Sequence, residues 1–176
     1  MAAFAALDLG RLDVFALLVG DGIATLEPSS AERSLDWLRA QAYKIQSINF
    51  AHGIGPVVAW FGAEFRWKQQ FGYELEAEDR NLARLRDGFW YDVQPEEGLV
   101  LELRSFERAF QEDRDWSAGL LRIISRHSRY QLALGHRTFA IVHVTDGDSP
   151  VVGVTLGERS VLYPYSFPQA VPLGSA

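Results

Sequence analysis

Residues 71–89 read Phe71-Gly-Tyr-Glu-Leu-Glu-Ala-Glu-Asp-Arg-Asn-Leu-Ala-Arg-Leu-Arg-Asp-Gly-Phe89, an acidic segment followed by a run with helical spacing. Asn81 stands just before that run, and Asn is preferred at a helix N-cap because its side chain accepts hydrogen bonds from free backbone N–H groups. Leu82, Leu85 and Phe89 repeat at intervals of three and four, which predicts one apolar helix face. The stretch therefore predicts an acidic loop that leads into a short, Asn-capped helix.

Apolar segments on both sides of this stretch predict a parallel sheet. Residues 98–104 (Gly-Leu-Val-Leu-Glu-Leu-Arg) read as a strand, and residues 43–50 alternate as a strand does. Residues 138–144 are apolar on both faces, which is typical of a central, covered strand. A helix starting near Pro56 and a longer one ending near Gly135 separate the three strands. Because such crossovers join parallel strands, we predict an α/β fold with a three-stranded parallel sheet.

This order of elements, with Asn-Leu-x-x-Leu-x-Asp opening the short helix, resembles the barstar family of ribonuclease inhibitors over residues 43–144. Asn81, Leu82, Leu85 and Asp87 match the family pattern. The resemblance implies that the short helix and its preceding loop enter the active-site cleft of a ribonuclease, where Asp87 takes the place of a substrate phosphate. It therefore implies a non-catalytic inhibitor or immunity protein whose partner is a basic protein, a ribonuclease or related toxin.

Three positions depart from the family pattern. Ala83 stands where the family carries an acidic contact residue, Arg86 where it carries Trp, and Arg126 where it carries a contacting Glu. Two of the three substitutions introduce positive charge. The alternative interpretation is therefore a barstar-fold interaction module that does not inhibit a nuclease.

The acidic loop offers replacement contacts. Glu74, Glu76, Glu78 and Asp79 precede the helix, and carboxylates can substitute for phosphates in a cleft lined by Arg and Lys. Tyr and Trp are enriched at binding hot spots, which makes the aromatic residues beside the loop and helix candidates as well. The full set of expected partner-binding residues is Asp87, Glu74, Glu76, Glu78, Asp79, Tyr73, Asn81, Arg84, Arg86, Trp90 and Tyr91.

A plainer interpretation exists for the same residues. The acidic loop can be a solvated turn whose charges lie favourably beside a helix N-terminus. Asp87 can be a helix-end residue bonded locally, and Arg84 stands three positions before it, where a neutralising ion pair is expected. Trp90 and Tyr91 cannot both point inward from one helix end, so one of them is expected at the surface.

The chain ends predict additions to the barstar-like part. Apolar segments 12–19 and 23–26 flank Gly20-Asp-Gly22 and predict a β-hairpin, and Ser29 with Glu32 forms a capping-box pattern for a helix to about residue 42. Segments 151–156 and 160–163 predict a second hairpin. We therefore divide the chain into an N-terminal extension (1–42), a barstar-like domain (43–144) and a C-terminal hairpin and tail (145–176).

Composition narrows the class of function. The 176 residues carry a net charge of −6, which argues against nucleic acid as a partner because binding surfaces for nucleic acid need clustered Lys and Arg. There is no Cys, no apolar run long enough to span a membrane, and no basic, apolar leader, so a cytoplasmic location is expected. The four His share no metal-ligand spacing and no nucleophile motif is present, so we expect no catalysis, metal or cofactor. The oligomeric state stays open.

Overall fold

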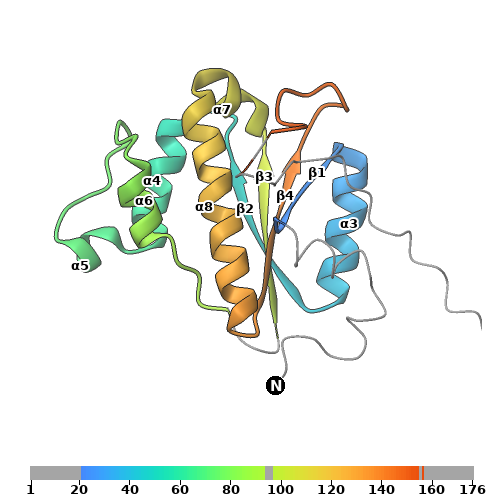
Figure 1. Ribbon diagram of the computed structural model, residues 1–176, viewed down its shortest axis with the longest axis horizontal. Coiled ribbons are helices and arrows are strands. Elements are labelled where there is room, and N and C mark those ends of the chain that lie inside the picture. The colour runs from blue at the N-terminus through green and yellow to red at the C-terminus, as the bar shows by residue number, and fades with distance from the viewer. Residues whose placement is uncertain (1–20, 94–96, 155, 157–176) are drawn as a thin grey trace, which may run out of the picture.

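The computed structural model describes residues 21–93, 97–154 and 156, which build a four-stranded, all-parallel sheet (Figure 1). The strands are β1 (Ile23–Leu26), β2 (Tyr43–Asn49), β3 (Gly98–Arg104) and β4 (Arg137–His143). Their order across the sheet is β1-β4-β3-β2. The carboxyl ends of all four strands therefore meet at one edge of the sheet.

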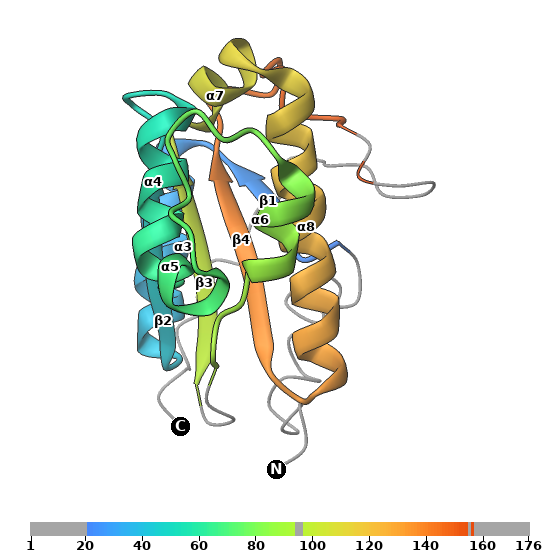
Figure 2. The same ribbon diagram turned by 90° about the vertical axis from the view of Figure 1, so that its left-hand side faces the viewer.

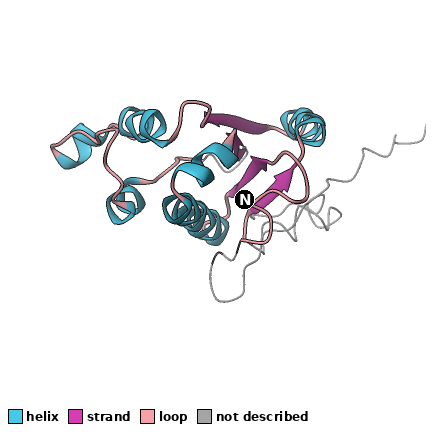
Figure 3. Cartoon of the chain, turned by 90° about the horizontal axis from the view of Figure 1, so that it is seen from above, coloured by secondary structure: helices cyan, strands magenta, loops and turns pink. Residues whose placement is uncertain are grey.

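Six helices of the described residues flank this sheet. They are α3 (Pro28–Ala40), α4 (Ile54–Glu64), α5 (Trp67–Phe71), α6 (Leu82–Gly88), α7 (Phe106–Glu112) and α8 (Arg114–Ala133). Seen from above, α3 lies on one side of the sheet and α8 on the other (Figure 3). On the α8 side, α6 lies in front of the sheet between α4 and α8 (Figure 2). The chain thus forms a three-layer α/β/α arrangement.

Each face of the sheet has its own apolar core. On the α3 side, Leu35 and Leu38 of the helix belong to one cluster with Val100, Phe139 and Ile141 of the central strands. The other face carries the alternate strand residues in a larger cluster with α4, α6 and α8, including Phe61, Leu85, Leu101, Leu120 and Val142. Successive strand residues point to opposite faces, so β3 and β4 must be apolar on both.

The three predicted strands are confirmed, and β4 is central because it lies between β1 and β3. The predicted number of strands is wrong. Residues 23–26 form a fourth strand, parallel to β4 with Ile23 opposite Ala140, where we expected one arm of an added hairpin. All four of these residues are buried, which a free hairpin arm would not achieve. The expected second arm, 12–19, lies outside the described residues.

Two further predictions near the chain ends need correction. Helix α3 begins at Pro28 with Glu27 at its N-cap and without a side-chain cap, so the Ser29 capping box does not form. Proline is well suited to the first helical position, where its missing N–H costs nothing, and the helix consequently starts earlier. In the C-terminal part, residues 151–153 form a turn where a strand was expected, and 160–163 lie outside the described residues.

Candidate protein-binding surface

The start of α6 is fixed by hydrogen bonds from its preceding loop. Oδ1 of Asn81 accepts from the backbone N–H groups of Ala83 at 3.0 Å and Arg84 at 3.2 Å, which confirms the predicted N-cap. The backbone N–H of Asn81 in turn donates to Oδ1 of Asp79 at 2.8 Å. Both side chains thus hold the loop against the helix, which leaves little of either for an external partner.

Helical spacing predicted an ion pair between Arg84 and Asp87. In the structure Arg84 pairs with Asp79 instead. Nη1 of Arg84 lies 3.0 Å from Oδ2 of Asp79, and the guanidinium lies 5.3 Å from the ring centroid of Tyr73. The Asp79 side chain is only 13% exposed. The loop backbone turns Asp79 back over the first turn of α6, where it reaches Arg84 before Asp87 can.

The carboxylate of Asp87 projects from the end of α6. Its side chain is 61% exposed, and its ion-pair partner is the adjacent Arg86, with Nη2 3.1 Å from Oδ1. Exposed ion pairs contribute little free energy, so this pair can open when a stronger partner arrives. The position implied by the family resemblance is therefore accessible, with a positive charge beside it.

The acidic loop divides into paired and unpaired carboxylates. Glu74 lies 2.9 Å from Nζ of Lys68, and the hydrogen bond between them raises the pKa of Lys68. Glu76 and Glu78 are exposed and form no ion pair with any described residue. These two carboxylates are the loop charges that a basic partner could neutralise.

The two neighbouring aromatic residues at the end of α6 separate as expected. Trp90 is 48% exposed, whereas Tyr91 is buried, with its ring centroid 5.1 Å from that of Phe65 and 5.6 Å from that of Phe89. Burial raises the pKa of the Tyr91 hydroxyl well above its ordinary value. Tyr91 therefore belongs to the core, and its buried side chain cannot serve as the contact that we predicted. Trp90 and the 38% exposed Tyr73 remain accessible to a partner.

A pocket of about 190 Å³ opens between α6 and α8, beside Asp87. The Trp90 ring lies 5.3 Å from that of Tyr130 and 5.4 Å from that of His127. Tyr130 is 53% exposed and was not among the predicted residues. The pocket is lined by Arg86, Asp87, Phe89, Trp90, Ile123, Arg126, His127 and Tyr130.

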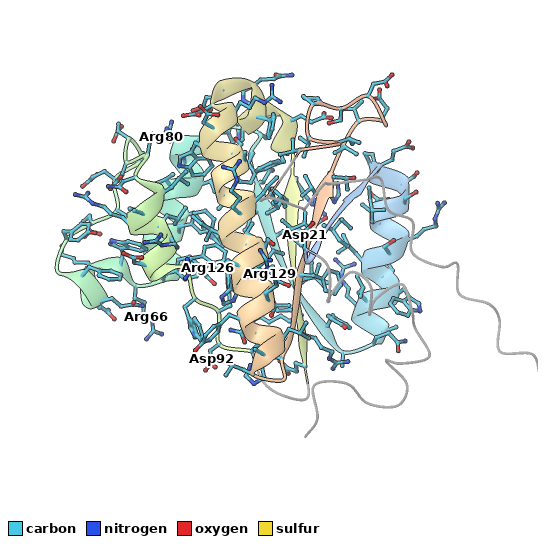
Figure 4. All side chains as sticks on the ribbon, in the orientation of Figure 1. Asp21, Arg66, Arg80, Asp92, Arg126 and Arg129 are labelled. Carbon is cyan, nitrogen blue, oxygen red and sulfur yellow. The ribbon has the colours of Figure 1, made fainter. Side chains whose placement is uncertain are left out.

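The charge around this pocket is mixed. Arg126 projects from α8, with Arg129 one turn further along (Figure 4), and neither forms an ion pair with a residue in the described part of the chain. Burial lowers the pKa of His127 to about 4, so its imidazole is neutral near pH 7. The pocket thus offers aromatic walls and a free guanidinium, with a single carboxylate at its rim.

The described residues include neither a metal site nor a membrane-spanning helix. No group of three or more His, Cys, Asp or Glu side chains is arranged to hold a metal ion there. Within the same residues, every helix is too short or too polar to cross a membrane.

No protein-family model, no curated protein and no solved structure matches this chain. The resemblance to the barstar family therefore rests on the residues quoted above, and the function it implies stays a prediction.

Proposed function

We propose that this protein is a non-catalytic inhibitor of the barstar kind, which covers the active site of a basic ribonuclease or related toxin. The contact surface, called the α6 surface below, comprises Glu76, Glu78, Asp87 and Trp90. The observation that carries the proposal is the set of accessible carboxylates at the two ends of α6. Glu76 and Glu78 lie before the helix without ion pairs, and Asp87 lies near its end, 61% exposed.

The chemistry of such an interface is electrostatic. A ribonuclease cleft binds phosphates with Arg and Lys, and carboxylates that reach the same side chains form charge-assisted hydrogen bonds. The net charge of −6 would also accelerate the encounter with a basic partner. Burial of a carboxylate costs free energy unless it finds a partner, so only those that meet an Arg or Lys add affinity.

Trp90 and the adjoining pocket supply the apolar part of the surface. An exposed Trp beside a pocket is a common anchor in protein interfaces because it buries a large area with few rotatable bonds. With Tyr130 at 5.3 Å, Trp90 forms one wall of a space large enough for a single side chain of the partner. This feature supports protein binding regardless of the identity of the partner.

A second candidate function is an interaction module of the same fold that does not inhibit a nuclease. The observation that favours it is positive charge beside the principal carboxylate. Arg86 pairs with Asp87 at 3.1 Å, and Arg126 lines the same pocket without an ion pair among the described residues. Both charges would oppose a uniformly basic cleft.

Capture from a lysate of the native organism separates these candidates. Wild type is compared with the double variant Asp87→Ala/Glu76→Ala, bound proteins are eluted with salt, and the eluted proteins are identified. Asp36→Ala is the matched control, since Asp36 is an exposed carboxylate on α3 beyond the sheet. The proposal expects a basic nuclease that wild type and the control retain and the double variant loses. Equal capture of an unrelated protein by all three would support the module instead.

A further inference from the structure

A buried polar cluster lies on the α3 side of the sheet, apart from the α6 surface. Glu102 of β3 is completely buried and accepts hydrogen bonds from Oγ of Ser47 and from Nε of Arg104, the latter at 2.8 Å. Nε2 of His143, at the end of β4, lies 3.0 Å from Oε1 of Glu102. Three strands thus converge on a single carboxylate.

Glu102 stays ionised in this position. Burial acts to raise its pKa, but the hydrogen bonds from Ser47 and Arg104 outweigh burial and hold the pKa below its ordinary value. An ion pair that buries a carboxylate seldom adds net stability, so the role of the Glu102–Arg104 pair is better sought in what it positions. Here the carboxylate engages Nε of Arg104, and the two terminal nitrogens of that guanidinium form no hydrogen bond within the described residues.

The cluster borders a cavity of about 570 Å³ at the carboxyl ends of β3 and β4, next to α7 at the top of Figure 1. In open parallel sheets, ligands bind outside the carboxyl ends of the strands. The volume also falls in the range of small-molecule sites, roughly 300–1,000 Å³. The cavity is lined by Pro28, Glu32, Arg104, Ser105, Glu107, Arg108, Gln111, His143, Val144 and Thr145.

Most of the polar groups that remain free in this cavity are hydrogen-bond donors. The carboxylate of Glu107 is already occupied, since it accepts from the backbone N–H of Thr145 at 2.9 Å and from its hydroxyl. Arg108 lines the cavity and forms no ion pair with a described residue, and Arg104 retains its terminal N–H groups. Of the two carboxylates that line the cavity, the other is Glu32, which is exposed at its rim and takes no part in these contacts.

We propose that this cavity binds a small molecule through a phosphate or carboxylate group held by Arg104 and Arg108. Planar guanidinium groups match both anions because they donate two parallel hydrogen bonds. Ser105, at the turn between β3 and α7, adds a hydroxyl to the same lining. The site is separate from the α6 surface, so the protein would carry a small-molecule site in addition to its protein-binding surface.

The test is a titration of the ¹⁵N-labelled full chain with inorganic phosphate, pyrophosphate and citrate, each at constant ionic strength near neutral pH. Amide chemical shifts are recorded for wild type, Arg108→Gln and Arg122→Gln. Arg122 is the matched control because it is an exposed residue of α8 without an ion pair to a described residue. The spectra also report whether each variant is folded. Arg104 is left intact because its loss would leave the buried Glu102 without its cationic partner.

Saturable shifts at residues 104–108 and 143–145 with at least one of the three anions are expected, and the best binder identifies the preferred group. Arg108→Gln should weaken that binding about tenfold, the effect of losing one charge-assisted contact, whereas Arg122→Gln should leave it within about twofold. Absence of saturation with all three anions would overturn the proposal. So would equal weakening by both variants, because that result indicates nonspecific attraction to positive charge.

Discussion

Nη2 of Arg86 lies 3.1 Å from Oδ1 of Asp87, so the carboxylate implied as the main contact carries a positive partner on its own helix. The two side chains are 49% and 61% exposed. A basic partner must therefore displace the Arg86 guanidinium or approach Asp87 from its free side. Under the proposed function, this ion pair would make binding weaker than an unpaired carboxylate would give.

Substitution of Arg86 by Ala is expected to strengthen binding of a basic partner. It removes a competing cation from Asp87, and because an exposed pair contributes at most about 1 kcal/mol, we expect a gain in affinity of up to about fivefold. The free energy of unfolding should change by less than about 0.5 kcal/mol. Titration calorimetry with the captured partner measures the first quantity and urea denaturation the second. Weaker binding would mean that Arg86 itself contacts the partner.

Substitution of Gly88 by Ala is expected to destabilise the protein and to disturb the end of α6. A Cβ at this position would lie 2.2 Å from Cζ3 of Trp67, whose side chain is 1% exposed and cannot move into solvent. Overpacking of this kind costs about 1–3 kcal/mol. Gly147→Ala is the control, since nothing lies within 4 Å of its added Cβ. Urea denaturation that finds the two variants equally stable would contradict this packing.

The three seven-residue strands, β2, β3 and β4, were predictable from their apolar patterns. Residues 98–104 carry Leu99, Val100, Leu101 and Leu103, and they form β3 with the predicted bounds. The four residues of β1 offered a weaker signal, because a short apolar segment beside a Gly-rich turn suits a hairpin as well as a parallel strand. Its pairing with β4 depends on the tertiary fold, which sequence periodicity does not encode.

The candidate surface was predictable as a region but not in its pairings. Asn81 was identifiable because a cap is a local feature, whereas the choice of Arg84 between Asp79 and Asp87 depends on how the loop backbone turns. Helical spacing says nothing about that turn. Tyr130 gave no signal either, since it contributes to the pocket only through its contact with Trp90, which is distant in sequence.

The pair of buried Glu102 and half-exposed Arg104 on β3 predicts unequal effects of its two partners on stability. Arg104→Met leaves the fully buried Glu102 without its neutralising cation and should cost about 3–5 kcal/mol. Glu102→Gln keeps a hydrogen-bonding side chain and leaves behind an Arg104 that is 50% exposed, so its cost should be about 1–2 kcal/mol. Urea denaturation near neutral pH compares them. Equal costs, or the reverse order, would show that Arg104 does not stabilise the protein by neutralising the charge of Glu102.

His127 predicts loss of stability in mild acid. Its pKa is lowered by burial to about 4, so the unfolded chain binds the proton at higher pH than the folded chain does. The stability that depends on a neutral His127 is fully present above the unfolded pKa of about 6.5 and is lost as the pH falls toward 4. Between about pH 7 and pH 4.5, this effect lowers the free energy of unfolding by about 2–3 kcal/mol.

The variant His127→Phe isolates this contribution, since Phe keeps an aromatic ring against Phe89 and Trp90. Unfolding by urea at the two pH values should show a smaller loss of stability in the variant than in wild type. Other groups, including His143, whose pKa burial also lowers, titrate in both proteins and cancel in the comparison. Identical losses would mean that His127 is not buried in its neutral form.

The most direct test of the central claim is inhibition of the captured nuclease. Its RNA cleavage rate is measured during titration with wild type, Asp87→Ala/Glu76→Ala and the control Asp36→Ala. We predict that wild type and the control abolish cleavage at one equivalent, while the double variant requires at least about tenfold more protein, corresponding to about 1.4 kcal/mol. Stoichiometric inhibition by the double variant would place the contact elsewhere. Undiminished cleavage in the presence of bound wild type would show that the protein is a binding module and not an inhibitor.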